Sequence, residues 1–449
     1  MSEASGSQSQ TIPLSDFLSA RDDLHFVWND ANRETSELWL RPVEAAALDP
    51  RKHKVFHHGH KEYLRPPAPF VQQGPELGDS GSTVVYKVTA PEGYSYRRPL
   101  ALKVIVCKDN FRPPGPDSWV RRKALEEVKN MTNIRHPHIV AYVASFEDYC
   151  IQPSESRSRQ GKGRRLSFVG THPQHIKRHI LGIAMYPPAQ CNLHTFMNEV
   201  FHDPKEVDWM LAHLHTYFGC LSQAVAYLHN QGVRIRHKDI KPENVVIDDF
   251  GLPILTDFGL SKHFEAGQYS EGPTLKTLKY ADPEAVHETS RDVSSDIFSL
   301  GCVFLEMATV LLGKPPLFAE EQLNFLDGRP SNQFKYSESL HNLDTYLALL
   351  SSTHLVARNC RQQESTAAVL QILPHIRRMM DEDQKKRPRA QELYPWFRHL
   401  YDVYEAPGPC PNCEAERATG KAIPLPPMSG SGNPRASQGS IGGSAHKRG

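Results

Sequence analysis

The residues best suited to chemistry lie in two short stretches near the middle of the chain, at 237–244 (HKDIKPEN) and 257–259 (DFG). The first offers a carboxylate at Asp239, an ammonium group at Lys241 and a carboxamide at Asn244, and Asp257 adds a second carboxylate. A carboxylate can orient a hydroxyl group, and a lysine can stabilise negative charge on a phosphoryl group. Carboxylate and carboxamide oxygens are hard ligands that suit Mg²⁺. This set favours a site that transfers a phosphoryl group.

In order and spacing, the two stretches resemble the catalytic segment of the eukaryotic protein kinases. The resemblance implies that Asp239 orients the substrate hydroxyl and that Lys241 stabilises the transferred phosphoryl group. It also implies that Asn244 and Asp257 hold Mg²⁺. The fold it implies is α+β, the bilobal protein-kinase fold with a β-rich N-lobe, a helical C-lobe, and ATP with Mg²⁺ between them.

Upstream of the catalytic stretch, the hydrophobic pattern predicts the strands that such a site needs. Apolar residues alternate at 83–88 (TVVYKV) and at 100–105 (LALKVI), which is typical of β-strands. Two further strands are expected around 139–147 and 179–185.

The loop before the first of these strands, 77–82 (LGDSGS), contains glycine, which lets backbone amides approach phosphate oxygens closely. The resemblance therefore implies contacts to the nucleotide from Gly78, Ser80 and Gly81. The loop departs from the kinase pattern because the second and third glycines fall on Ser80 and Thr83. That departure affects how the loop covers the nucleotide.

A lysine and a glutamate are expected to hold the phosphates of ATP. Lys103 lies where kinases place the lysine that binds the α- and β-phosphates. Residues 119–135 predict a helix, and Glu127 within it is the preferred partner of Lys103, with Glu126 as the alternative.

The adenine site is also implied by the resemblance. Met185 and Pro187 lie at the hinge whose backbone binds adenine, and the usual acidic residue there is replaced by Tyr186. The residues expected to sandwich the ring are Val85, Ala101 and Val246. These side chains are equally suited to a hydrophobic core.

After the hinge, the pattern is helical. Residues 210–229 have a wide apolar face typical of a central buried helix. Helical patterns return at 343–350, 367–380 and 390–404, whereas 315–342 favours a loop.

Three further residues that match the kinase pattern lie after the catalytic stretch in the sequence. Glu284 is expected to form a buried ion pair with Arg387, and Asp296 to brace the backbone of the catalytic loop. Two departures stand nearby: Lys238 replaces the usual arginine, and Asp282 replaces the usual alanine. The activation segment is residues 260–278. An arginine could bind a phosphate on this segment through two hydrogen bonds, whereas a lysine offers only a point charge. Phosphorylation-dependent activation therefore stays open, with candidate residues Tyr269, Ser270, Thr274 and Thr277.

The domain organisation follows from these patterns. Residues 1–70 are an N-terminal extension, 71–186 the kinase N-lobe, 187–405 the C-lobe and 406–449 a disordered tail.

The N-lobe carries a basic insertion, about 151–178, whose polar composition predicts disorder. Within it, Ser167 follows two arginines and is a hypothetical phosphorylation site. A His-rich tract (His53, His57, His58 and His60) is interpreted as a solvated loop.

Bulk composition excludes several classes of protein. Among 449 residues, 39% are hydrophobic and 23% charged, with a formal net charge of +1. These values are typical of a globular protein and do not favour a nucleic-acid binder. No apolar run of the ~20 residues that span a bilayer is evident, so no membrane partner is expected.

The eight cysteines are scattered, which predicts reduced thiols and an intracellular location, in the cytoplasm, the nucleus or both. One close pair, Cys410 and Cys413, could form half of a zinc site. Zinc would need two more ligands, and no second such pair exists. The preferred interpretation is a flexible tail with two free thiols.

The function that the sequence favours is transfer of the γ-phosphoryl group of MgATP to serine or threonine of protein substrates, within intracellular signalling. Lys241 resembles the lysine of serine/threonine kinases, and Thr277 agrees with that class. The alternative is a pseudokinase scaffold that binds nucleotide without efficient catalysis, which the altered glycine loop, Lys238 and Asp282 motivate. A small-molecule kinase is a third possibility, disfavoured by Glu284 and Arg387. Oligomeric state is not predicted.

Overall fold

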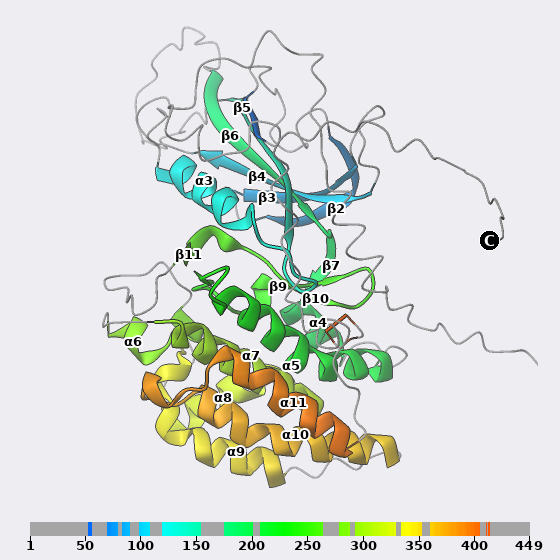
Figure 1. Cartoon of the computed structure of the whole chain (residues 1–449), viewed down its shortest axis with the longest axis vertical. Coiled ribbons are helices and arrows are strands. Elements are labelled where there is room, and N and C mark those ends of the chain that lie inside the picture. The colour runs from blue at the N-terminus through cyan, green and yellow to red at the C-terminus, as the bar shows by residue number, and fades with distance from the viewer. Residues whose placement is uncertain are drawn as a thin grey trace, which may run out of the picture.

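The structure is a computed structural model, shown in Figure 1. The residues it describes are 53–55, 70–79, 83–89, 98–107, 119–153, 175–200, 207–263, 278–287, 292–328, 334–352, 360–404, 410 and 412–413. Within these ranges a β-rich lobe lies over a helical lobe, so the predicted bilobal α+β fold is confirmed (Figure 1).

The N-lobe is built on one twisted sheet. Its order in the described ranges is β1-β5-β6-β4-β3-β2, with β1 parallel to β5 and the other neighbours antiparallel. The strands are β1 (His53–Val55), β2 (Val71–Asp79), β3 (Thr83–Thr89), β4 (Leu100–Cys107), β5 (Ala141–Pro153) and β6 (His175–Tyr186). All four strands expected from the sequence are therefore present.

Alternation along β3 assigns its residues to two faces of the sheet. Val84, Tyr86 and Val88 are buried in a cluster on one face, whereas Val85 points to the other face, towards the C-lobe core. Val85 pairs with Lys103 of β4, and Ala101 of β4 pairs with Met185 of β6. Because side chains alternate with a period of two, this register brings the predicted nucleotide-binding residues of three strands to one face.

Helix α3 (Trp119–Met131) packs beside the sheet (Figure 1). Val85 packs against the same core as the buried residues of this helix. Val128 and Met131 are buried in the core that the two lobes share. After α3 the chain runs along β10 (Pro253–Leu255): Leu255 N donates to His138 O (2.9 Å) and Val140 N to Leu255 O (3.0 Å). These bonds attach the N-lobe to the C-lobe.

The C-lobe is mostly helical. Its helices are α4 (Leu193–Glu199), α5 (Val207–His229), α6 (Pro283–Val286), α7 (Ser294–Leu311), α8 (Phe318–Asp327), α9 (Leu343–Ser352), α10 (Cys360–Met379) and α11 (Ala390–Tyr404). Short strands lie at its upper edge: β7 (Ala189–Asn192), β9 (Val245–Asp248) and β10 form one sheet, and β8 (Ile235–Arg236) pairs with β11 (Lys262–His263).

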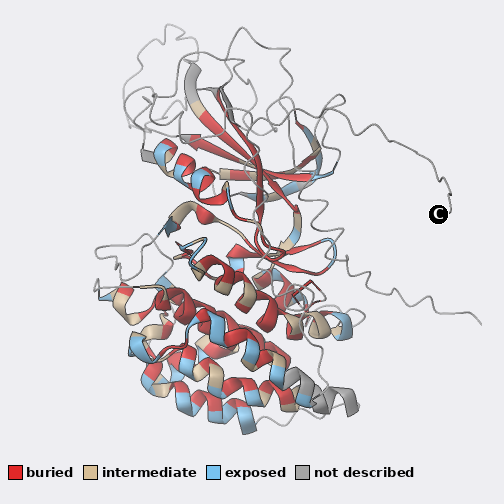
Figure 2. Cartoon of the chain, in the orientation of Figure 1, coloured by how far each residue is buried: buried red, intermediate tan, exposed pale blue. Residues whose placement is uncertain are grey.

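Helix α7 forms the centre of the helical lobe, between α5 and α10 (Figure 2). Every residue of α7 is buried. By length and composition it is the one described helix that could cross a membrane, yet all of it is buried inside the fold. Its apolar character is that of a core helix.

Within the two lobes, the structure differs from the sequence prediction at three places. Residues 315–342 do not form a loop throughout, because α8 and two 3-10 helices, η6 (Tyr336–Glu338) and η7 (Leu340–Asn342), lie there. Strands β5 and β6 pair as far as Pro153 and His175, so the backbone is ordered into both ends of the expected insertion. Strand β1, from the N-terminal extension, pairs with β5 and so joins the N-lobe sheet.

Other predictions lie outside the described residues. They concern the rest of the insertion with Ser167, the histidines at 57, 58 and 60, the activation-segment residues 264–277, and most of the tail after 406.

Candidate active site

Lys103 joins both lobes at the predicted phosphate site. Its Nζ donates to Glu127 Oε1 (2.7 Å) and Oε2 (3.0 Å) of α3, and to Asp257 Oδ1 (3.0 Å) at the start of the DFG turn. Glu127 is 4% exposed, whereas Asp257 is 43% exposed. The structure thus brings Lys103 to Glu127 and leaves Glu126 on the exposed face of the helix.

Electrostatics favour the charged forms of this cluster. Burial alone would lower the pKa of Lys103, but the carboxylates of Glu127 and Asp257 raise it above its ordinary value. The ammonium group of Lys103 in turn lowers the pKa of Asp257 to about 2. Asp257 is therefore ionised near neutral pH, as a metal ligand must be.

The catalytic-loop residues lie together on the C-lobe side. Asn244 Nδ2 donates to the main-chain oxygen of Asp239 (2.8 Å) and to Asp239 Oδ2 (2.9 Å), and Lys241 Nζ lies 2.9 Å from the same carboxylate oxygen. The Asn244 side chain is held at η2 (Pro242–Asn244), where Pro242 occupies the first turn. The loop therefore fixes a carboxylate, an ammonium group and a carboxamide at one place.

Asp296, in the first turn of α7, braces this loop from below. Its Oδ2 accepts from His237 N (2.8 Å) and its Oδ1 from Lys238 N (2.8 Å), and His229 Nε2 lies 2.9 Å from Oδ2. Lys238 has a left-handed backbone (φ 69). The two main-chain bonds hold this uncommon conformation in place.

The DFG turn is positioned by contacts that the sequence prediction missed. The ring of His237 packs edge-on against Phe258 with 4.9 Å between ring centres, and its Nε2 lies 3.0 Å from the Thr256 carbonyl oxygen. Asn130 of α3 donates to the Ser261 carbonyl oxygen (2.8 Å), just after the turn. The HKD order could have indicated His237, but no sequence spacing indicates Asn130.

The residues expected around adenine share the core at the lobe junction. Ala101 and Met185 are buried there, with Val85, Val246 and Leu77 partly buried against them. Gly78 pairs with Val85 at the end of β2, and a side chain there would meet nothing within 4 Å. Pro187 follows β6 at the hinge. Ser80 and Gly81 lie outside the described residues.

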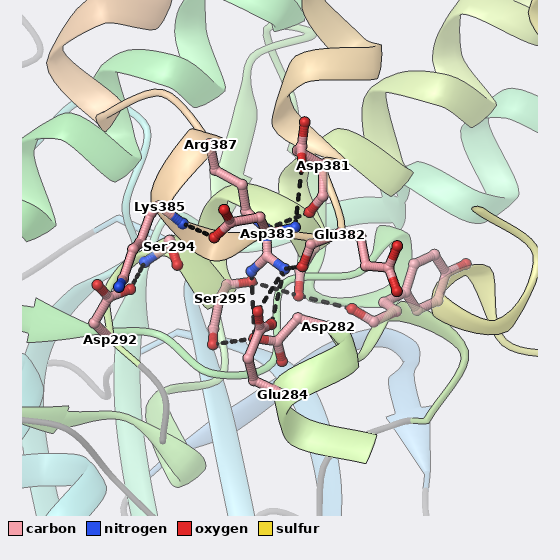
Figure 3. A network of polar contacts seen from close by, with 12 residues as sticks. Asp282, Glu284, Asp292, Ser294, Ser295, Asp381, Glu382, Asp383, Lys385 and Arg387 are labelled. Atoms are coloured by element: carbon pink, nitrogen blue, oxygen red, sulfur yellow. Dashed lines mark hydrogen bonds and ion pairs between the residues drawn. The ribbon is translucent and has the colours of Figure 1, made fainter. Parts of the chain in front are cut away.

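A buried ion-pair network holds residues 282–284, which follow the activation segment, against Arg387 (Figure 3). Arg387 donates to both carboxylate oxygens of Glu284, at 3.1 and 2.8 Å, as predicted. Asp282, the unusual residue, also faces Arg387 (3.6 Å) and accepts from Ser295 Oγ (2.5 Å). Arg387 further donates to the Asp381 carbonyl oxygen at 2.8 Å. Asp282 thus adds a second carboxylate around one buried guanidinium group.

The donor set fits a magnesium ion. Asp257 is ionised and partly exposed, and Asn244 uses its amide hydrogens toward Asp239, which leaves its carboxamide oxygen to accept a cation. Both offer hard oxygen ligands. The expected metal ligands, Asn244 and Asp257, therefore have the chemistry of a Mg²⁺ site.

A two-lobed fold with a lysine–glutamate pair, an Asp-Lys-Asn loop and a DFG turn defines a kinase-like phosphotransferase site. The protein kinase domain family matches residues 71–397. That range is more than half of the chain, so the protein belongs to the protein kinase family.

Several curated proteins are similar over parts of this domain. The serine/threonine-protein kinase AtPK1/AtPK6 of Arabidopsis thaliana is 34% identical over 148 residues, which are 33% of this chain and 28% of that relative. A probable cell division protein kinase of Encephalitozoon cuniculi is 33% identical over 144 residues, covering 30% of this chain and 44% of the relative. Mitogen-activated protein kinase kinase kinase 3 of Arabidopsis thaliana is 30% identical over 219 residues, covering 48% and 28%. The chain thus spans less than half the length of each.

Proposed function

We propose that this protein is an active serine/threonine protein kinase that transfers the γ-phosphoryl group of MgATP to hydroxyl groups of protein substrates in signalling. The observation that carries this proposal is the cluster in which Lys103 contacts both Glu127 (2.7 Å) and Asp257 (3.0 Å). This arrangement needs α3, β4 and the DFG turn to be in position together, which is a requirement for catalysis in protein kinases.

Each residue has a chemical part in the proposed reaction. Lys103, held by Glu127, binds the phosphates of ATP, and Asp239 orients the substrate hydroxyl towards the γ-phosphorus. Lys241, 2.9 Å from Asp239, stabilises the charge that develops on the transferred group. Asn244 and Asp257 would hold Mg²⁺, which when bound neutralises charge on the phosphate oxygens.

Selection of serine and threonine rests on two supports. Lys241 follows Asp239 by two residues, as in serine/threonine kinases, and AtPK1/AtPK6 is named a serine/threonine-protein kinase. The pseudokinase alternative is weaker because Lys103, Asp239, Asn244 and Asp257 are all present and in contact with one another or with Glu127.

The test is transfer of labelled γ-phosphate from MgATP to the protein itself and to a degenerate mixture of Ser, Thr and Tyr peptides. Wild type is run beside Lys103→Met and Asp257→Asn, with the exposed Asp249→Asn as the matched control. We expect label on serine or threonine with wild type and the control, and none with the other two variants. Absence of transfer by the folded wild type, with melting raised by MgATP, would establish the nucleotide-binding scaffold instead.

We also propose an intracellular location, in the cytoplasm, nucleus or both. Its support is that no disulfide bond joins the cysteines whose side chains the structure describes. A fluorescent fusion in intact cells would test it, and secretion of the fusion into the medium would contradict it.

A further inference from the structure

Four side chains that can act as metal ligands meet near the junction of the two lobes, from three distant parts of the chain. They are His138 between α3 and β5, Cys220 of α5, and Cys410 and Cys413 beyond α11. Their ligand atoms all lie within 4.8 Å of one another. All four residues are buried, with exposed fractions of 0% for His138, Cys220 and Cys413 and 4% for Cys410. The two tail cysteines are therefore not the solvated thiols that the sequence suggested.

The histidine is oriented as a ligand. His138 Nδ1 lies 2.8 Å from the Pro253 carbonyl oxygen, which can only accept, so Nδ1 carries the proton. That tautomer leaves the lone pair of Nε2 directed at the cysteines, 3.1 Å from Cys410 Sγ. A carbonyl that fixes the second ring nitrogen is the usual outer-shell partner of a metal-bound histidine.

The two tail cysteines are held in a turn. Cys413 N donates to the Cys410 carbonyl oxygen at 3.0 Å, and Asn412 between them is buried at 2% exposure. This C-x₂-C spacing directs both thiols to one point, as in many structural zinc sites. The segment thus supplies two ligands, and the kinase core supplies the other two.

Packing alone does not account for the convergence. A single buried cysteine such as Cys302 of α7 behaves as a small apolar side chain. Three thiols can form at most one disulfide bond, which would leave a third thiol and the imidazole without a role. Among the described residues, this is the one group of three or more His, Cys, Asp or Glu with metal-site geometry.

We propose that His138, Cys220, Cys410 and Cys413 bind one Zn²⁺ ion in a closed tetrahedral site. With Zn–S bonds of about 2.3 Å, tetrahedral ligands lie roughly 3.8 Å apart, which the observed spread of up to 4.8 Å admits with small side-chain shifts. Thiolate and imidazole ligands select zinc over Mg²⁺ or Ca²⁺. Four protein ligands leave no position for substrate, so the role of the ion is structural.

The site would fasten the chain after α11 to the junction of the lobes. His138 belongs to the segment that hydrogen-bonds to β10, and Cys220 belongs to α5 of the C-lobe core. One ion would then link the chain after α11, the segment that joins the lobes, and helix α5 of the C-lobe. This inference does not rest on the proposed catalytic function, because none of the four ligands belongs to the phosphotransfer site.

The first test is the metal content of the purified full-length chain, prepared without a histidine tag and under reducing conditions. Elemental mass spectrometry should find about one zinc per chain in wild type. The double variant Cys410→Ser/Cys413→Ser should lose the zinc, whereas Cys191→Ser, a half-buried cysteine outside the cluster, should retain it.

Cobalt substitution of the wild type keeps the test independent of variant folding. Co²⁺ exchanged into the full chain should show the visible bands of tetrahedral cobalt and a near-ultraviolet thiolate-to-cobalt band. Folded, reduced wild type with neither zinc nor cobalt bands would overturn the proposal. So would iron in place of zinc, or a Cys410–Cys413 disulfide found by peptide mass spectrometry under native conditions.

Discussion

Asp296 shows how one buried carboxylate controls the catalytic loop. It accepts two main-chain hydrogen bonds of 2.8 Å, from His237 and Lys238, and lies 2.9 Å from His229 Nε2. Burial would raise the pKa of Asp296, but the hydrogen bond and charge of His229 hold it below its usual range. An ionised acceptor is therefore available to hold Lys238 in its left-handed conformation.

Replacing Asp296 with asparagine should weaken both stability and turnover. An amide has one oxygen, so its NH₂ group would face a main-chain N–H and lose a charged hydrogen bond worth about 1.5–3 kcal/mol. Misplacement of Asp239 should lower kcat by about 100-fold. Urea unfolding and steady-state kinetics measure the two effects. Asp383→Asn, which also accepts a main-chain bond but is exposed, is the control and should change neither.

Arg387 should matter more than either of its acidic partners. Its side chain and that of Asp282 are 0% exposed, and Glu284 is 12% exposed. Arg387→Met leaves two carboxylates without their cationic partner and should lower the free energy of unfolding by about 3–5 kcal/mol. Glu284→Gln leaves Asp282 to balance the guanidinium charge and should lower it by less. Equal losses in urea unfolding would mean that Asp282 does not share the charge of Arg387.

At the scale of the element, helix α5 carries a histidine that burial keeps neutral. His215 is 2% exposed, and burial lowers its pKa to about 4. Its ordinary value is 6.5, so between these values the unfolded chain binds more protons than the folded one. The contribution of His215 to stability is therefore complete above pH 6.5 and is lost as the pH falls towards 4.

This histidine should give a measurable pH dependence. Between about pH 7.5 and about pH 5, His215 should account for a loss of about 2 kcal/mol in the free energy of unfolding. His215→Gln should remove that part of the loss, and His263→Gln, an exposed residue, should leave it in place. Urea titrations at the two pH values measure the difference, and identical losses in all three proteins would refute the assignment.

At the scale of the whole molecule, the N-terminal extension completes the sheet. Strand β1 covers β5 at Ser145–Glu147, whose three side chains are at most 1% exposed. Without β1, β5 would become an edge strand with unpaired main-chain groups, which is a template for association with another chain.

Removing β1 should therefore promote self-association. A chain lacking residues 1–60 should elute with a larger or broader mass distribution and melt at a lower temperature than one lacking residues 1–50, which keeps β1. Light scattering after size exclusion, with thermal melts, makes the comparison. The same mass and melting temperature in both would show that β1 is dispensable.

The functional residues that lie in short motifs could be predicted from the amino-acid sequence alone. Asp239, Lys241 and Asn244 are separated by a few positions along one loop, so their order alone indicates the chemistry. Strands β3 and β4 were also predictable, because a half-buried strand alternates apolar and polar residues. For α8, signals existed in Glu320 and Glu321 at its start and Gly328 (φ 65) at its end, but the surrounding loop-like composition outweighed them.

Features that depend on contacts between distant segments emerged from the three-dimensional arrangement alone. Helix α3 is rotated about its axis so that Glu127 is buried and Glu126 is exposed, and Lys103 can therefore reach only one of the two adjacent glutamates. The role of Asp282 depends on its contact with Arg387 (3.6 Å). The role of Cys410 depends on its contact with His138, 272 residues away along the chain. Local sequence carries periodicity and motif spacing, whereas a cluster assembled from three segments has no spacing that a linear sequence can display.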